Sequence, residues 1–262
     1  MNKIETEELK KLQIQILKNV SGFCDKYNIK YFLSYGTLIG AIRHNGYIPW
    51  DDDIDICMPR PDYERFLNLY NKESDTFKVI EHRIDDNYKL PFAKVHDTRT
   101  VMNELLYVKD SFGVYIDVFP IDAVKSSKQL KISIIWNKFL NTKRAIIDNK
   151  RSVSKNIIIY LGKIILYPLS ISFILNQINK VAQQASFEKS IYAANIVSSY
   201  GECEIMSKQF YSEYIKHTFE EEKYNIPKEY HSILTKIYGN YMQLPPIEKR
   251  ITHHTFEAWW KE

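Results

Sequence analysis

The chain reads Pro49-Trp50-Asp51-Asp52-Asp53-Ile54-Asp55-Ile56 near its amino-terminal end, and this stretch decides the fold. Its last part alternates between acidic and apolar residues. Because successive side chains of an extended strand point to opposite faces, Asp53 and Asp55 share one face, while Ile54 and Ile56 share the other. We expect the isoleucines to join the core. Two carboxylates on a rigid strand suit a magnesium ion, Mg²⁺, which commonly fills its other positions with water and substrate phosphate.

A possible phosphate site precedes this stretch. An apolar strand is expected at about residues 30–34, and Gly36-Thr37 then opens a short helix from Thr37 to Arg43. A helix N-terminus after a glycine turn presents backbone N–H groups to an anion. A phosphate site and a metal site on adjacent elements form the arrangement of a nucleotidyltransferase fold. We therefore predict an α/β (α+β) fold, with a mixed sheet flanked by helices.

A third acidic residue is expected in a buried strand at residues 114–122. Val114, Ile116 and Val118 share one face of this strand, and Asp117 lies on the opposite face. A buried charge without a partner is costly, so Asp117 needs compensation. A metal ion already held by Asp53 and Asp55 would supply it.

The other elements follow from periodicity and from helix signals. Residues 6–27 have apolar residues at helical spacing, with Thr6 as the predicted cap. A helix is expected to begin near Pro61, because proline is favoured in a first turn. Strands are expected at residues 77–81 and 90–96, and a further helix at 227–238.

Composition restricts the class of protein. The chain has 262 residues and a net charge of only +4, which does not argue for a nucleic-acid partner. Three widely spaced cysteines, Cys24, Cys57 and Cys203, favour a reduced cytoplasmic chain. The amino-terminal residues are too acidic for a signal peptide and lack an apolar run.

We divide the chain into a catalytic core at residues 1–125 and a mainly helical region at 126–262, which contains a helical insertion and a C-terminal helical segment that completes the site. Residues 157–175 are nearly all apolar and approach the roughly 20 residues that span a bilayer. Lys163 and Pro168 interrupt them, which favours a helix pair bent at Pro168. Buried core, docking on a membrane surface and a membrane span remain the three readings of this segment.

Three blocks of sequence closely resemble the LicD family of phosphocholine transferases. The blocks are residues 35–55, 113–122 and 238–250, the last reading Tyr238-Gly239-Asn240-Tyr241-Met242-Gln243-Leu244-Pro245-Pro246-Ile247-Glu248-Lys249-Arg250. The same superfamily includes the fukutin-type ribitol-phosphate transferases. The resemblance is close over residues 10–120 and 225–255 and loose between them.

The resemblance implies transfer of a phospho-alcohol from a CDP-activated donor to a sugar hydroxyl, with release of CMP. The donor is expected to be CDP-choline, with CDP-ribitol or CDP-glycerol as alternatives. The acceptor would be a glycan such as teichoic acid, lipopolysaccharide or capsule precursor, expected to be linked to lipid at the inner face of the membrane. Carried onto this chain, Asp53 and Asp55 match the metal ligands, Asp117 the third carboxylate, and Gly36-Thr37 the glycine turn. Asp51 matches the first acidic position of the motif.

A phosphoryl-type transfer needs charge neutralisation and in-line placement of the attacking and leaving groups. Mg²⁺, with Mn²⁺ as the alternative, would bridge the donor pyrophosphate, and a second ion would clamp both oxygens if the site holds two. Asp117 is expected to act as a ligand, as a general base, or as both.

Side chains outside the acidic set have two readings each. Arg43 and Lys94 are candidates for phosphate contacts, against a surface ion pair for Arg43 and an exposed strand position for Lys94. Trp50 would stack on a base or on choline, or pack in the core. For His253-His254 we favour a structural or acceptor-lining role over metal ligation.

Two rival functions come from other classes. A non-catalytic, membrane-associated interaction protein could keep the same fold, but the complete set of Asp53, Asp55 and Asp117 argues against it. A nucleotidyltransferase acting on nucleic acid is disfavoured by the near-neutral charge and the missing basic stripe.

Overall fold

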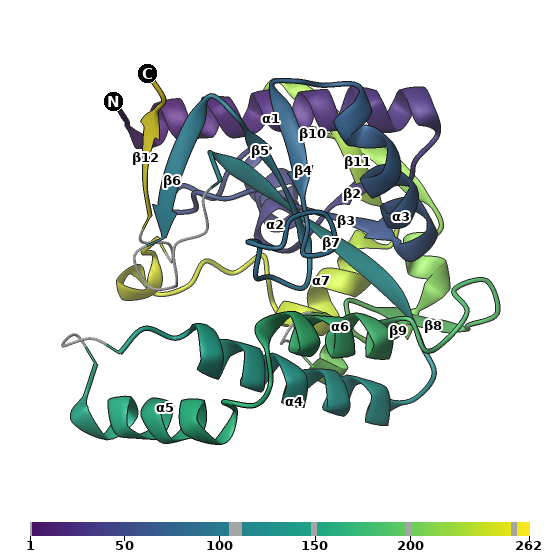
Figure 1. Ribbon diagram of the computed structural model, residues 1–262. Helices are drawn as coiled ribbons and strands as arrows, with labels where there is room; N and C mark the ends of the chain where they lie inside the picture. The colour runs from purple at the N-terminus through teal and green to yellow at the C-terminus, as the bar shows by residue number, and fades with distance from the viewer. Residues whose placement is uncertain (1, 105–111, 148–150, 198–200, 253–255) are drawn as a thin grey trace.

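The structure is a computed structural model that describes residues 2–104, 112–147, 151–197, 201–252 and 256–262 (Figure 1). Its central sheet is mixed: strand order is β2-β3-β7-β5-β4, and β8 and β9 extend the sheet from β7. β3 and β7 are parallel, and the other pairs are antiparallel. The strands are β2 (Phe32–Leu33), β3 (Asp55–Pro59), β4 (Phe77–Ile80), β5 (Ala93–Asp97), β7 (Tyr115–Val124), β8 (Tyr192–Ala194) and β9 (Met206–Ser207). The predicted α+β class with a mixed sheet is confirmed.

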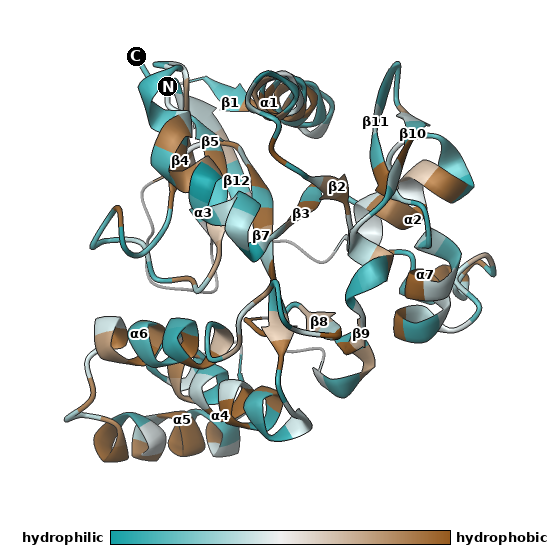
Figure 2. Ribbon diagram, turned by 90° about the vertical axis from the view of Figure 1, so that its right-hand side faces the viewer, coloured by the Kyte–Doolittle hydropathy of each residue, from teal (hydrophilic) through white to brown (hydrophobic). Residues whose placement is uncertain are grey.

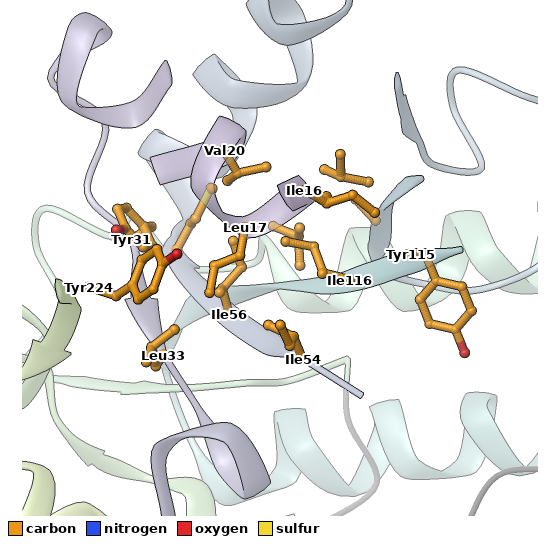
Figure 3. Close-up of a cluster of buried hydrophobic side chains, with 14 of the residues drawn as sticks. Ile16, Leu17, Val20, Tyr31, Leu33, Ile54, Ile56, Tyr115, Ile116 and Tyr224 are labelled. Carbon is orange, nitrogen blue, oxygen red and sulfur yellow. The ribbon is translucent and has the colours of Figure 1, made fainter. Parts of the chain in front are cut away.

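Helix α1 (Thr6–Tyr27) packs its apolar face on the strands that carry the acidic residues. Figure 3 shows Leu17 of α1 beside Ile56 of β3, with Ile54 and Ile116 in the same cluster. Ile54 and Ile56 are fully buried, so the predicted core face is confirmed. The predicted cap is wrong by one residue, because Glu5 occupies the N-cap position and Thr6 is already helical.

Two further helices flank the central sheet. Helix α2 (Tyr35–His44) begins two residues earlier than predicted, and helix α3 (Arg60–Leu69) begins beside Pro61 as expected. The guanidinium of Arg60 donates two hydrogen bonds to the buried carboxylate of Asp122, at 2.6 and 2.9 Å. This buried ion pair joins the start of α3 to β7.

The helical region contains α4 (Ser127–Arg144), α5 (Val153–Ile165) and α6 (Ile171–Ala182). The predicted break around Pro168 is confirmed, because α5 ends before it and α6 begins after it. The core reading holds for Ile174 and Leu175, which are buried, but it is wrong for residues 157–165, since every residue of α5 is at least partly exposed. Across the described ranges, we find no helix with both the length and the apolar character that crossing a membrane requires.

The chain returns to the first core after α6. Strands β10 (Tyr214–Phe219) and β11 (Glu222–Pro227) form a hairpin, and helix α7 (Tyr230–Tyr238) follows it. Strand β12 (Phe256–Trp260) lies between β1 (Lys3–Ile4) and β6 (Thr100–Glu104). Phe219, Tyr224 and Leu234 are buried in the same cluster as α1. The helical part therefore ends at Ala182, and the following strands and α7 pack with the amino-terminal half of the chain.

Candidate active site

The parallel pairing of β3 and β7 brings two acidic residues together. Asp55 and Asp117 lie opposite each other in the register of these strands. The backbone N–H of Asp117 donates to the carbonyl oxygen of Ile54 at 2.8 Å, which fixes that register at the start of both strands. The carboxylates of two separate strands therefore meet at the amino-terminal ends of β3 and β7.

The loop before β3 adds three more carboxylates. One oxygen from each of Asp51, Asp52 and Asp53 lies within 4.8 Å of the others, and all three residues are half-buried. Asp51, Asp53 and Asp55 line one cleft, so the predicted common orientation of Asp53 and Asp55 is present although β3 begins only at Asp55. Closely spaced carboxylate oxygens are the donor set that a hard divalent cation prefers, so these residues fit such an ion.

Gly36 is required by a close approach rather than by a turn. A Cβ atom at this position would lie 2.7 Å from Oδ2 of Asp51. A positive φ occurs at the preceding residue, Tyr35, at +48°. A non-glycine residue in this region carries backbone strain, and such strain tends to persist at functional sites. The bare Cα of Gly36 thus allows the Asp51 carboxylate to sit against the first turn of α2.

Tyr35 is held in this conformation by its hydroxyl group. The hydroxyl donates to the buried carboxylate of Glu204, with distances of 3.0 and 3.1 Å to its oxygens, and accepts a 2.8 Å hydrogen bond from Nδ2 of Asn195. The ring also packs edge-on against Phe119. Burial raises the pKa of Tyr35 well above its usual value, with the Glu204 charge as the next cause. The tyrosine is therefore a neutral anchor at the start of α2.

Thr37 acts on the acidic strand directly. Its side chain is buried, and its hydroxyl oxygen accepts a 2.8 Å hydrogen bond from the backbone N–H of Asp55. The hydroxyl therefore fixes the first peptide of β3 to α2. Thr37 does not line the cleft with Gly36. Its placement is that of a positioning residue for Asp55.

Lys94 is buried against Asp117, so the reading of an exposed strand lysine is wrong. Lys94 is 2% exposed, and its Nζ donates a hydrogen bond to Oδ1 of Asp117 at 2.6 Å. The same ammonium lies 3.3 Å from the ring centre of Tyr115. The compensation that we expected Asp117 to receive from a metal ion is thus supplied, at least in part, by a lysine of β5.

The carboxylates of Asp51, Asp53, Asp55 and Asp117 repel one another at the start of β3 and β7. Burial raises the pKa of Asp55 well above its usual value, the charges of Asp53, Asp117 and Asp51 raise it further, and Lys94 opposes them. A group with this shift is destabilised in its charged form. A bound cation would relieve that cost, which is a second physical reason why the residues present fit one.

Asp51, Asp53 and Asp55 form one side of a cleft of about 780 Å³. The opposite wall comes from the segment after α7, which the sequence analysis assigned to the site as a block without naming roles for its side chains. The lining residues of this segment are Tyr238, Asn240, Tyr241, Gln243, Pro245, Glu248, Lys249 and Ile251. The family motif block at residues 238–250 was the signal for them.

Two arginines join the walls of the cleft. Nη1 of Arg43 donates to the carbonyl oxygen of Tyr241 at 2.6 Å, and Nε donates to Nε2 of His44 at 3.0 Å, so the predicted surface ion pair is not what holds it. Burial, followed by the charge of Arg250, lowers the pKa of Arg43. The guanidinium of Arg250 lies 5.5 Å from the ring centre of Trp50. Arg43 lines the cleft and is repelled by the charge of Arg250, so an anion bound beside Arg43 would be favoured.

The C-terminal segment also contacts the acidic loop. Asp52 was not among the residues selected from the sequence, yet its Oδ2 accepts a 2.7 Å hydrogen bond from the hydroxyl of Thr252, and its carbonyl oxygen accepts a 3.0 Å hydrogen bond from Gln13. No local pattern singled it out from its two acidic neighbours. The readings of His253 and His254 lie outside the described residues.

Comparison with known proteins identifies the family. The family described as the LicD/FKTN/FKRP nucleotidyltransferase domain matches residues 28–154. The lipopolysaccharide cholinephosphotransferase LicD of Haemophilus influenzae is 32% identical over 273 aligned residues, which cover 99% of this chain and 99% of that protein. The chain belongs to the LicD family.

Membership of the LicD family makes this chain a phosphotransferase. An uncharacterized protein of Rickettsia typhi is 40% identical over 73 residues, covering 28% of this chain and 22% of that protein. A second, from Rickettsia prowazekii, is 40% identical over 68 residues, covering 22% of this chain and 26% of that protein. The full-length match to a named transferase answers the rival reading of a non-catalytic interaction protein in favour of an enzyme.

Proposed function

We propose that this chain transfers phosphocholine from CDP-choline to a sugar hydroxyl of a cell-surface glycan and releases CMP. The acceptor is lipopolysaccharide or, as further members of the class, a teichoic acid or capsule precursor. The observation that carries the proposal is the start of β3 and β7, where Asp55 lies opposite Asp117 and lines, with Asp53 and Gly36, the cleft beside α2. The relative whose name specifies lipopolysaccharide and choline phosphate aligns over nearly the whole of both chains.

In the proposed reaction, the acceptor hydroxyl oxygen attacks the phosphorus atom that bears choline. The new bond joins this oxygen to phosphorus, and the bond from phosphorus to the bridging oxygen of the pyrophosphate breaks, so that CMP leaves with that electron pair. The hydroxyl proton passes to a base, and Asp117 is the candidate on the β7 side of the site. Asp117 accepts a hydrogen bond from Lys94 and lies opposite Asp55 in the strand register, which places it beside the proposed ligands.

Asp53 and Asp55 are the proposed ligands of Mg²⁺ or Mn²⁺, with Asp51 beside them and Asp117 as ligand or base. When bound, the ion would neutralise the donor phosphates. Arg43 lines the same cleft, with the charge of Arg250 nearby, and would bind the phosphate charge that remains. Trp50 offers an aromatic face that is already used by a cation, which is the chemistry of a choline contact.

The decisive experiment uses Asp53→Asn in the full chain. We expect transfer of phosphocholine from CDP-choline to purified lipopolysaccharide to fall at least about 1000-fold, because the substitution removes one of the charges that hold the cation. Asp86→Asn is the matched control, since Asp86 is an exposed carboxylate in a loop outside the cleft. Unchanged turnover by Asp53→Asn would end the proposal for the acidic site.

The donor is tested separately by thermal shift with Mg²⁺ and CDP-choline, CDP-ribitol or CDP-glycerol. A ligand that binds only the folded chain raises Tm by mass action. A shift with CDP-choline alone supports the proposed donor. A shift with a polyol nucleotide alone would replace choline by that alcohol while keeping the same chemistry. We propose that the reaction takes place in the cytoplasm, on the three widely spaced cysteines.

A further inference from the structure

Helix α5 presents a wide apolar face to solvent. Its exposed apolar residues follow the helical repeat and fall within an arc of roughly 160° at 100° per residue. Figure 2 shows α5 as a hydrophobic helix at the edge of the molecule opposite α1. The exposed residues are Val153 (76%), Ile157 (53%), Ile158 (69%), Tyr160 (58%), Leu161 (52%), Ile164 (54%) and Ile165 (75%). Such a continuous apolar surface indicates an interaction site.

The opposite side of α5 is held by α4. A Cβ atom at Gly162 would lie 2.7 Å from Cγ2 of Thr142, so the two helices are in close contact there. Nζ of Lys143 donates to the carbonyl oxygen of Leu166 at 3.0 Å and also to that of Leu169, just beyond the end of α5. A cation at this end complements the helix dipole. The helix is therefore fixed in place with its apolar face outward.

The surroundings of this face are strongly basic. Residues 123–187 contain eleven lysines and arginines and one aspartate, although the whole chain carries only +4. Lys128, Lys131 and Lys138 are exposed along one line of α4 that leads to Thr142 and so to α5. Lys155 lies on α5 itself and is exposed beside the apolar face. The positive charge of the chain is thus concentrated in the segment that contains the exposed isoleucines, although Lys131 pairs with Glu202 at 3.3 Å, and the rest of the chain is net negative.

We propose that α5 docks on an anionic lipid surface, lying parallel to it with the apolar face at the boundary between headgroups and acyl chains. A helix of 13 residues is about 20 Å long and fits this interfacial position. Lysines around an apolar face attract anionic headgroups. A second copy of this chain is a poorer occupant, because two such faces would bring like charges together. This inference does not depend on the identity of the donor or the acceptor.

The test is flotation of the full chain with vesicles of phosphatidylethanolamine and phosphatidylglycerol at a molar ratio of 7:3. We expect the fraction bound to exceed that on phosphatidylcholine vesicles about tenfold and to fall sharply in 0.5 M NaCl, because salt screens the headgroup attraction. Binding through a choline-recognising cleft would give the reverse order of the two vesicles and would overturn the proposal.

The paired substitution Ile158→Glu with Ile165→Glu should lower binding to the anionic vesicles at least about tenfold, since it places two charges in the apolar face. Both side chains are exposed, so the fold should persist, which an unchanged Tm would verify. Ile191→Glu is the matched control, because Ile191 is 73% exposed and lies outside α4 and α5. Equal flotation of the double variant and the wild type would overturn the proposal. The proposal would also be overturned if light scattering showed a dimer of the wild type and a monomer of the double variant while neither protein bound vesicles.

Discussion

The strands that carry the acidic residues and helix α5 are both rich in isoleucine, but they place it in opposite environments. Ile54, Ile56 and Ile116 are fully buried under α1 (Figure 3), whereas Ile158 and Ile165 of α5 are more than two thirds exposed. At the start of the first of these strands, Ile54 and Ile56 alternate with Asp53 and Asp55, which line the cleft. In α5, the apolar residues continue around the outer side of the helix. The difference shows that burial depends on which surface the fold supplies opposite a side chain.

The largest effect should come from the cleft side of the strands. We expect Asp55→Asn to lower phosphocholine transfer at least about 1000-fold, because it removes a charge from the proposed cation site. The same variant should have a higher Tm than the wild type in EDTA at pH 7. Burial and the charges of Asp53 and Asp117 raise the pKa of Asp55, so its charged form is disfavoured in the folded chain.

The pH dependence of this gain follows from the sign of the shift. A carboxyl group whose pKa is raised by folding does not destabilise the folded chain while it is protonated in both states. The folded chain loses stability as pH rises from the pKa of the unfolded chain, about 3.9, through the higher pKa of the folded chain. The Tm difference between Asp55→Asn and the wild type should therefore grow above about pH 4. A variant that is less stable than the wild type at pH 7 would contradict the repulsion that we describe.

A second prediction compares the two environments of isoleucine directly. Ile56→Ala should lower the free energy of unfolding by about 2 to 5 kcal/mol, because it leaves a cavity under α1. Ile158→Ala should change it by less than about 0.5 kcal/mol, since the side chain is mostly in solvent. Urea denaturation of both variants measures the two values. Similar losses would mean that α5 is packed in solution against a surface that the single chain does not provide.

A third prediction concerns the close approach at Gly36. Gly36→Ala should lower transfer by roughly 10- to 100-fold, because the new Cβ must displace the Asp51 carboxylate from the first turn of α2. Gly22→Ala is the control within another helix, where a Cβ meets nothing within 4 Å. It should leave transfer unchanged and stabilise the chain by about 0.5 to 1 kcal/mol, the smallest effect in this series. Equal activity of the two variants would show that the position of Asp51 does not matter.

Local patterns predicted those features that depend on neighbours in sequence. The alternation at residues 53–56 correctly separated the core face from the cleft face, and the interruption at Pro168 correctly divided two helices. The long apolar run left burial and an outward-facing position of α5 both open, because periodicity alone does not reveal which helix covers another. The position of Asp117 in an apolar strand indicated that it would join Asp55, and the resemblance to the family gave the same pairing.

Features that depend on strand register could not be predicted. Lys94 lies opposite Asp117 only because β5 pairs with β7, and no pattern around either residue records that pairing. The left-handed backbone of Tyr35 could not be predicted, because tyrosine rarely adopts it and the contacts of its hydroxyl come from Asn195 and Glu204, far away in the sequence. The strands between residues 192 and 227 were also missed, since they are short and pack on elements far away in the sequence.

Tyr35 connects the acidic loop with the helical region of the chain. Its backbone begins α2 beside the acidic loop, while its hydroxyl is tied to Asn195, whose neighbour Ile196 is packed among α4 and α6. A tilt of the helical layer would therefore pull on one phenol and turn the first peptide of α2 with it. Docking of the helical region on a surface and the backbone conformation beside the acidic loop would then be coupled through Tyr35.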